Sequence, residues 1–158
     1  MNWIISKSEK LTYHTNLKVL LEPIRSDIEG FTWLISDLEY NPDYHKGLSI
    51  DHEHHYFVLS SSEFQNLLSS DVQIIWGVLL GIPAGRAISV DGRNLPFAEF
   101  NDLIWKNGNI QHQDAVIEID CVDSSYTIVK FKDRMLSDKF QTFFSEVIEL
   151  EKFSNSYS

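Results

Sequence analysis

The sequence is short of cysteine and of basic residues, and each shortage excludes a class of protein. Its single cysteine, Cys121, excludes an internal disulfide and is typical of a protein from a reducing cytosol. Thirteen Lys and Arg residues stand against 23 Asp and Glu residues, so the formal net charge is -10. Nucleic-acid binding requires basic side chains that displace phosphate counterions. We therefore expect no nucleic-acid partner.

The sequence also lacks any segment that predicts membrane insertion or export. Its apolar run Ile74–Ile82 is much shorter than the ~20 residues that span a bilayer. The N-terminus has no basic region followed by an apolar segment and a small-residue cleavage site, so we expect no signal peptide. These features predict a cytoplasmic protein with no membrane partner.

Apolar and aromatic residues, in contrast, are plentiful. The 158 residues are 43% hydrophobic and 13% aromatic, which is enough to fill the core of one domain. We find no linker, internal repeat or low-complexity block that would divide the chain. We predict a single domain over residues 1–153 and a frayed tail over residues 154–158.

The run Ile74–Ile82 is the element around which we expect the fold to form. It is bounded by Asp71 and Pro83 and carries no charged or polar side chain. Gly77 and Gly81 argue against a helix, where each would cost about 1 kcal/mol relative to Ala. Short bounded runs rich in Ile and Val are typical of strands buried on both faces. We therefore predict a central strand.

Local patterns predict the other elements. Further strands are expected at residues 3–5, 31–35 with an extension to 40, 56–59, and in a small hairpin over 87–95 around Asp91-Gly92. Four helices are expected. The first covers 11–21, is capped by Thr15 or Thr12 and ends before Pro23, and the second is opened by a Ser60–Glu63 capping box. The third covers Phe97–Trp105, with Phe97, Phe100 and Ile104 facing inward, and the last is capped by Ser137, with Phe140, Phe143, Phe144, Val147 and Ile148 facing inward.

A hairpin over residues 115–132 is predicted together with its register. A three-residue loop, Asp123-Ser124-Ser125, gives both strands matching faces, whereas a two-residue loop would set apolar side chains against charged ones. The expected pairs are Cys121 with Thr127, Ile119 with Val129, Ile117 with Phe131, and Glu118 with Lys130. Together these elements predict an α+β fold, with a largely antiparallel sheet and about four helices packed mainly on one face.

The segment Asp51-His52-Glu53-His54-His55 is a candidate metal site. At the start of a strand, His52 and His54 would share one face, which is a spacing that metal sites use. A zinc or iron ion would need further ligands, for which His112, Glu118 and Asp120 are candidates. The alternative is a polar loop whose imidazoles face water.

Other candidate sites have weaker patterns. The segment Gly81–Arg86 follows a strand but matches neither the dinucleotide nor the P-loop pattern, although Arg86 and Arg93 would bind an anion if they met across the small hairpin. Ser60–Ser62 lack a nucleophile elbow, and Cys121 faces inward in the predicted register. No nucleophile, base and oxyanion donors come together, so we predict neither a catalytic site nor a cofactor.

The distribution of acidic residues is the strongest functional signal. Between Ser26 and Glu63, eight acids are opposed by Lys46 alone, and Trp33, Tyr40, Tyr44 and Tyr56 lie among them. Aromatic side chains with carboxylates are suited to a basic protein partner, while the alternative is an ordinary solvated acidic surface. The predicted partner-binding residues are Asp37, Glu39, Tyr40, Asp43, Tyr44, Asp51 and Glu53.

One segment carries a resemblance to a known family. Asn16–Ile35, with its Leu-rich helix, Glu-Pro-Ile and Gly-Phe-Thr-Trp-Leu-Ile, resembles the N-terminal part of a family of small acidic bacterial domains of unknown function. In size, acidity and layout the chain is also similar to immunity proteins of bacterial toxin systems. The resemblance implies a protein that neutralises a partner toxin. With the concentrated acidity and the lack of a catalytic motif, we predict a non-catalytic protein that binds a basic toxin. A metal-binding protein that uses His52 and His54, and a self-associating structural protein, are the two alternatives.

Overall fold

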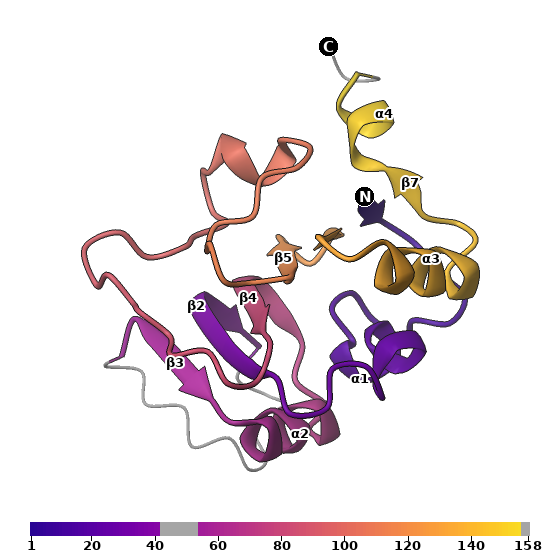
Figure 1. The fold of residues 1–158 in the computed structure, drawn as a ribbon. Helices are drawn as coiled ribbons and strands as arrows, with labels where there is room; N and C mark the ends of the chain where they lie inside the picture. The colour runs from indigo at the N-terminus through magenta and orange to yellow at the C-terminus, as the bar shows by residue number, and fades with distance from the viewer. Residues whose placement is uncertain (42–53, 156–158) are drawn as a thin grey trace.

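The strands form one antiparallel sheet in the order β3-β2-β4-β5-β6-β1-β7 (Figure 1). The computed structural model of the protein describes residues 1–41 and 54–155. The strands are β1 Asn2–Ile5, β2 Thr32–Tyr40, β3 Tyr56–Leu59, β4 Ile74–Ile82, β5 Ile117–Val122, β6 Tyr126–Phe131 and β7 Ile148–Glu149. The helical segments are α1 Leu17–Leu20, α2 Ser61–Ser69, α3 Arg134–Phe143 and α4 Leu150–Asn155, with the 3-10 helices η1 Glu22–Ile24 and η3 Asp102–Trp105.

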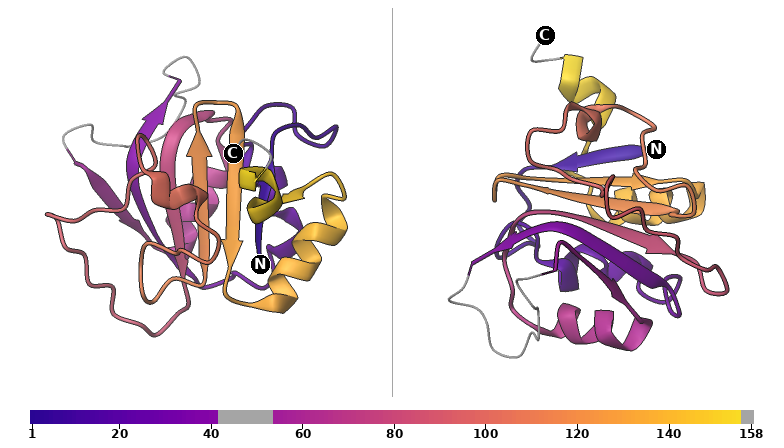
Figure 2. Two further views of the ribbon diagram at one scale, coloured as in Figure 1. Left: turned by 90° about the horizontal axis from the view of Figure 1, so that it is seen from above. Right: turned by 90° about the vertical axis from the view of Figure 1, so that its left-hand side faces the viewer.

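The two faces of the sheet are covered differently, as Figure 2 shows. Helices α1, α2 and α3 pack on one face, and the other is covered by α4 and by the largely irregular segment 83–116, which contains η3. The predicted α+β class and the helices mainly on one face are confirmed. In the described part of the chain, no helix is long and apolar enough to cross a membrane. The backbone of residues 154 and 155 belongs to α4, and residues 156–158 lie outside the described residues.

Strand residues alternate between two cores, one on each face of the sheet. The first core contains Trp33, whose ring stacks on that of Phe64 at a centroid distance of 4.0 Å. Residues of the first core include Ile35, Leu79, Ile119 and Val129, with Leu20 and Phe140 from the helices. Residues of the second core include Ile4, Leu34, Val78, Leu80 and Ile128, with Ile104 and Leu150 from the covering segments.

The predicted central strand is confirmed with its bounds, as β4. It pairs with β2 on one side and with β5 on the other, and from Gly77 to Ile82 it is buried. A Cβ atom at Gly81 would lie 3.0 Å from the Trp33 ring and 3.3 Å from the Phe31 ring. Glycine is therefore required where the indole of the neighbouring strand crosses the β4 backbone.

Two further predictions are confirmed in detail. The β5–β6 hairpin has the predicted register, including the Ile119–Val129 pair, and its loop is formed by residues 123–125. The capping box of α2 is also present, because Ser60 accepts from the Glu63 amide while the Glu63 carboxylate accepts from the Ser60 amide at 2.7 Å. Hydrogen bonds from Ser60 lower the pKa of Glu63.

The first helix is shorter than predicted and has a different N-cap. Asn16 rather than Thr15 or Thr12 caps α1, and its side chain accepts from the Val19 amide. Thr15 is fully buried with a φ of 63°, and its hydroxyl binds both the Ile74 carbonyl, at 2.8 Å, and the Ile74 amide, at 3.0 Å. Thr15 is thus bonded to the first residue of β4 instead of capping a helix. The predicted end before Pro23 is confirmed.

The last long helix begins and ends earlier than predicted. Asp133 is the N-cap of α3, because its carboxylate accepts from the Met135 amide at 2.7 Å and from the Leu136 amide. Ser137 lies inside the helix, where its hydroxyl oxygen accepts from the Trp3 indole at 2.9 Å. The helix ends at Phe143, since the chain turns so that Ile148 can pair with β1.

Most predictions for the segment 83–116 are wrong, although Ile104 is buried as predicted. Residues 87–95 form no strands, and the Asp91 side chain accepts from the Arg93 amide in a local turn. Of the helix expected over Phe97–Trp105, only the short η3 forms, and Phe97 and Phe100 are exposed instead of buried. Contacts with the sheet determine this conformation.

Candidate interaction surface

Three of the seven predicted partner-binding residues lie in the described part of the chain, near the end of β2. Asp37 has a φ of 53° at an irregularity in the β2–β4 register, which is the geometry of a bulge. Glu39 is exposed, whereas Tyr40 is only 9% exposed, and its burial raises the pKa of its hydroxyl. The other predicted residues, Asp43, Tyr44, Asp51 and Glu53, lie outside the described residues.

The Asp37 carboxylate faces the covering segment and fixes its backbone. Its Oδ2 atom accepts hydrogen bonds from the Ala98 amide at 2.7 Å and from the Glu99 amide at 3.0 Å. The neighbouring Ser36 is fully buried and donates to the Pro96 carbonyl at 2.6 Å. The end of β2 therefore acts as an anchor for residues 96–104, which we call the 96–104 loop.

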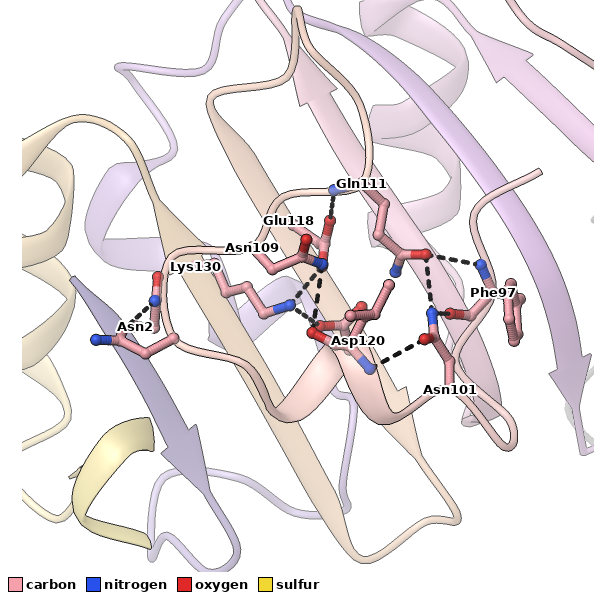
Figure 3. Close-up of polar contacts among 10 residues, drawn as sticks. Asn2, Phe97, Asn101, Asn109, Gln111, Glu118, Asp120 and Lys130 are labelled. Carbon is pink, nitrogen blue, oxygen red and sulfur yellow. Dashed lines mark hydrogen bonds and ion pairs between the residues drawn. The ribbon is translucent and has the colours of Figure 1, made fainter. Parts of the chain in front are cut away.

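Side chains inside the 96–104 loop add further anchors (Figure 3). Asn101 is buried, and it donates to the Phe97 carbonyl at 2.8 Å and accepts from the Leu103 amide at 3.0 Å. Gln111, which follows the loop, links Phe97 to Asn101, because its side-chain oxygen accepts from the Phe97 amide and from the Asn101 side chain, each at 3.1 Å. The loop has little regular structure, yet its conformation is fixed by directed hydrogen bonds.

This conformation turns large apolar side chains into solvent. The loop buries Pro96, Ala98, Asn101 and Ile104, and the exposed fractions of Phe97, Phe100 and Leu103 are 46%, 93% and 50%. Phe100 also has a φ of 58°, which costs a bulky side chain about 1–2 kcal/mol. Exposed acids, Glu99 and Asp102, flank Phe100, and no Lys or Arg lies between Asn94 and Trp105.

The predicted metal site lies only partly in the described residues. His52 lies outside them, and His54 is exposed just before β3, with its ring 6.5 Å from that of Phe57. The candidate further ligands have other partners: Glu118 and Asp120 bind Lys130, and His112 contacts the Ser89 carbonyl and the Asp114 amide. Within residues 1–41 and 54–155, no three His, Cys, Asp or Glu side chains are grouped to hold a metal ion.

A buried ion cluster lies beneath the covering segment and consists of Glu118, Asp120 and Lys130 (Figure 3). All three side chains are 0% exposed. The Lys130 ammonium donates to Glu118 Oε1 at 2.7 Å and lies 3.1 Å from Asp120 Oδ2. The second Glu118 oxygen accepts from the Gln111 amide at 2.5 Å, so the cluster also holds the covering segment.

The charges of the cluster do not balance, because two carboxylates share one ammonium group. Burial is the main cause that raises the pKa of Asp120 well above its ordinary value, and the Glu118 charge raises it further, while Lys130 opposes both. The Lys130–Asp120 contact is an ion pair and not a well-directed hydrogen bond. Carboxylates and an amine are acid–base groups, but these three have no exposed surface from which to act on a substrate.

The remaining candidate residues have structural partners. Arg86 pairs with Asp114 at 3.0 Å. Ser60 caps α2, as predicted. Cys121 is fully buried in the first core, and burial, with a contribution from Asp120, raises the pKa of its thiol. These contacts supply no nucleophile with an adjacent base.

Comparison with known proteins adds no further site. No family model, no curated protein and no solved structure matches the chain. Two features were not predicted from the sequence. The first is the exposure of Phe100, because its spacing from Phe97 and Ile104 resembles a helix face. The second is the burial of Glu118 and Lys130: the alternation of Glu118 and Asp120 with three apolar residues predicted which side chains share a face of the hairpin, but not that this face is buried.

Proposed function

We propose that the protein is a non-catalytic cytoplasmic binding module that captures a basic protein, as an immunity protein captures a toxin. The observation that carries this proposal is the apolar outer strand β3 in the most acidic part of the chain. Tyr56 and Val58 are 36% and 44% exposed, and within the described ranges β3 pairs with β2 alone. Natural sheets rarely leave an apolar edge strand uncovered, because it invites association.

The charges near this edge favour a basic partner. Three of the eight acids between Ser26 and Glu63 have structural tasks: Asp27 pairs with Lys139, Asp37 holds the 96–104 loop, and Glu63 caps α2. Glu39 remains exposed beside the β2 bulge. With a net charge of -10, the molecule attracts cationic proteins and speeds their encounter, and salt weakens this attraction.

Affinity capture with the tagged protein, at low and at high salt, tests the proposal. We expect a basic protein to be retained at low salt, to be weakened by high salt, and to bind E39K less well than the wild type. E9K is the matched control, because it makes the same change in net charge at an exposed residue before α1. Loss of binding in both variants to the same extent would indicate a general charge effect and contradict this placement.

Self-association is a second function that the same edge strand favours. Two copies of β3 would extend the sheet from one subunit to the other. Repulsion between two molecules of charge -10 opposes this arrangement. Sedimentation at several protein concentrations distinguishes the two functions, since a binding module for a basic partner remains a monomer by itself.

A further inference from the structure

We propose that Phe100 is the anchor with which the protein holds its partner. Phe100 enters an apolar pocket of a basic protein, and the flanking Glu99 and Asp102 pair with basic residues at the rim of that pocket. The inference rests on the proposed function and adds to it the residue, the loop and the chemistry of contact. It is carried by the 96–104 loop, which lies outside the acidic segment from which the function was first inferred.

The exposure of Phe100 requires an explanation, because a glycine at this position would form the same loop without strain. Phe100 is 93% exposed and belongs to neither core. Its φ of 58° is strained for any residue with a Cβ atom, and glycine would adopt it freely. A large apolar side chain at a strained and exposed position is typical of a functional contact, where the surrounding structure maintains the strain.

The loop is preorganised for this contact. The Asp37 carboxylate holds the two amides that precede Phe100, and Asn101, directly after it, is buried and bonded to both arms of the loop. A partner that buries Phe100 therefore loses little loop entropy on binding. Exposed aromatic side chains with this rigidity are the residues that contribute most to protein interfaces.

The charges around Phe100 determine which class of molecule can bind the 96–104 loop. Glu99 and Asp102 are exposed on either side of it, and the loop has no basic residue to neutralise them. A second copy of the chain would bring the same acids against each other, in a molecule that already carries a net charge of -10. Nucleic acid and anionic membranes are excluded by the same repulsion. A basic protein with an apolar pocket fits both the ring and its rim.

A photo-crosslinker at position 100 tests this assignment. Phe100→p-benzoylphenylalanine is expressed in the source cells and irradiated, and the adduct is identified by mass spectrometry. The same replacement at Met135 is the control, because Met135 is 56% exposed on α3, across the sheet from the loop. We expect an adduct with a basic protein at position 100 and none with that protein at position 135.

Binding of the purified partner then measures the contribution of Phe100. F100A should weaken the equilibrium affinity by about 30-fold or more, as hot-spot aromatics do, whereas M135A should change it by less than about twofold. Neither substitution removes a core contact. F100G keeps the fold by relieving the strained φ, and it should lose affinity as F100A does.

The outcomes separate this inference from the function on which it rests. If a basic partner binds F100A as tightly as the wild type, the anchor is wrong and the proposed function stands. An adduct of position 100 with a second copy of the chain, or with an acidic protein, also overturns the anchor. If the wild-type protein captures no basic protein at all, the proposed function fails, and the anchor fails with it.

Discussion

Replacement of Lys130 by methionine should destabilise the protein far more than replacement of an exposed lysine. Lys130 is 0% exposed and is held by Glu118 at 2.7 Å and by Asp120 at 3.1 Å. Methionine retains most of the length of the lysine stem, so the main change is the loss of charge and not the creation of a cavity. The variant K130M therefore isolates the electrostatic task of Lys130.

The expected loss follows from the distances and the burial. At an effective dielectric constant of about 20, a charge pair at this separation has a gross attraction of about 6 kcal/mol. Desolvation of the two ions cancels most of that attraction in the wild type, but removal of one partner leaves a buried carboxylate uncompensated. We expect K130M to lower the free energy of unfolding by about 3–5 kcal/mol.

Urea denaturation at several pH values measures this loss and identifies its cause. The control is K152M, because Lys152 pairs with Glu149 at 2.8 Å with both side chains largely exposed, and such pairs contribute about 0–1 kcal/mol. Lys130 opposes the rise in the pKa of Asp120, so without Lys130 this carboxylate takes up a proton more readily, and the deficit of K130M should shrink at low pH and grow as the pH rises. A loss similar to that of K152M, or one independent of pH, would refute the reasoning.

Three further predictions concern single residues and use the same denaturation assay. The folded-state pKa of Asp120 is raised, so the stability linked to this group is fully present below the unfolded pKa of about 3.9 and is lost as the pH rises. Asparagine does not titrate, so D120N should gain stability relative to the wild type as the pH rises above about 4; a difference that does not change with pH would contradict this. F100G should raise the free energy of unfolding by about 0.5–1 kcal/mol, because the greater freedom of glycine in the unfolded chain offsets part of the strain relieved at a φ of 58°. F100A keeps a Cβ atom and should not raise it; equal effects would exclude strain. S60A should cost about 1 kcal/mol through loss of the α2 cap, and S60G only a few tenths, since glycine is a fair N-cap.

Elements whose pattern is decided locally were predictable from the sequence. The bounds of β4 follow from an apolar run between Asp71 and Pro83, and no other element competes for those residues. The register of the β5–β6 hairpin follows because a slip by one residue would set Ile119 against Lys130. The Ser60–Glu63 cap needs only four consecutive residues.

Elements decided by distant partners were not predictable. Phe97, Phe100 and Ile104 have helical spacing, but two backbone amides of this segment donate hydrogen bonds to Asp37, about sixty positions earlier, and this holds the backbone in another conformation. Thr15 could cap a helix, yet its hydroxyl binds Ile74. For the candidate surface, the acidic composition near Glu39 was readable, whereas the exposure of Phe100 depends on contacts that no local pattern encodes.

The covering segment explains why an ion cluster is retained in the core. Residues 83–116 supply three buried side chains to the second core, two of them alanines, and four more apolar residues are partly buried against it. The segment is also held to the sheet by polar anchors, from Ser36, Asp37 and Glu118. A buried acceptor such as the Glu118 carboxylate requires a cation, and Lys130 provides it from the neighbouring strand. Apolar residues in place of the cluster could fill the same volume, but they would leave the Gln111 amide without its acceptor. The charge in the core is therefore tied to the position of a loop on the surface, and the exposure of Phe100 is a consequence of both anchors.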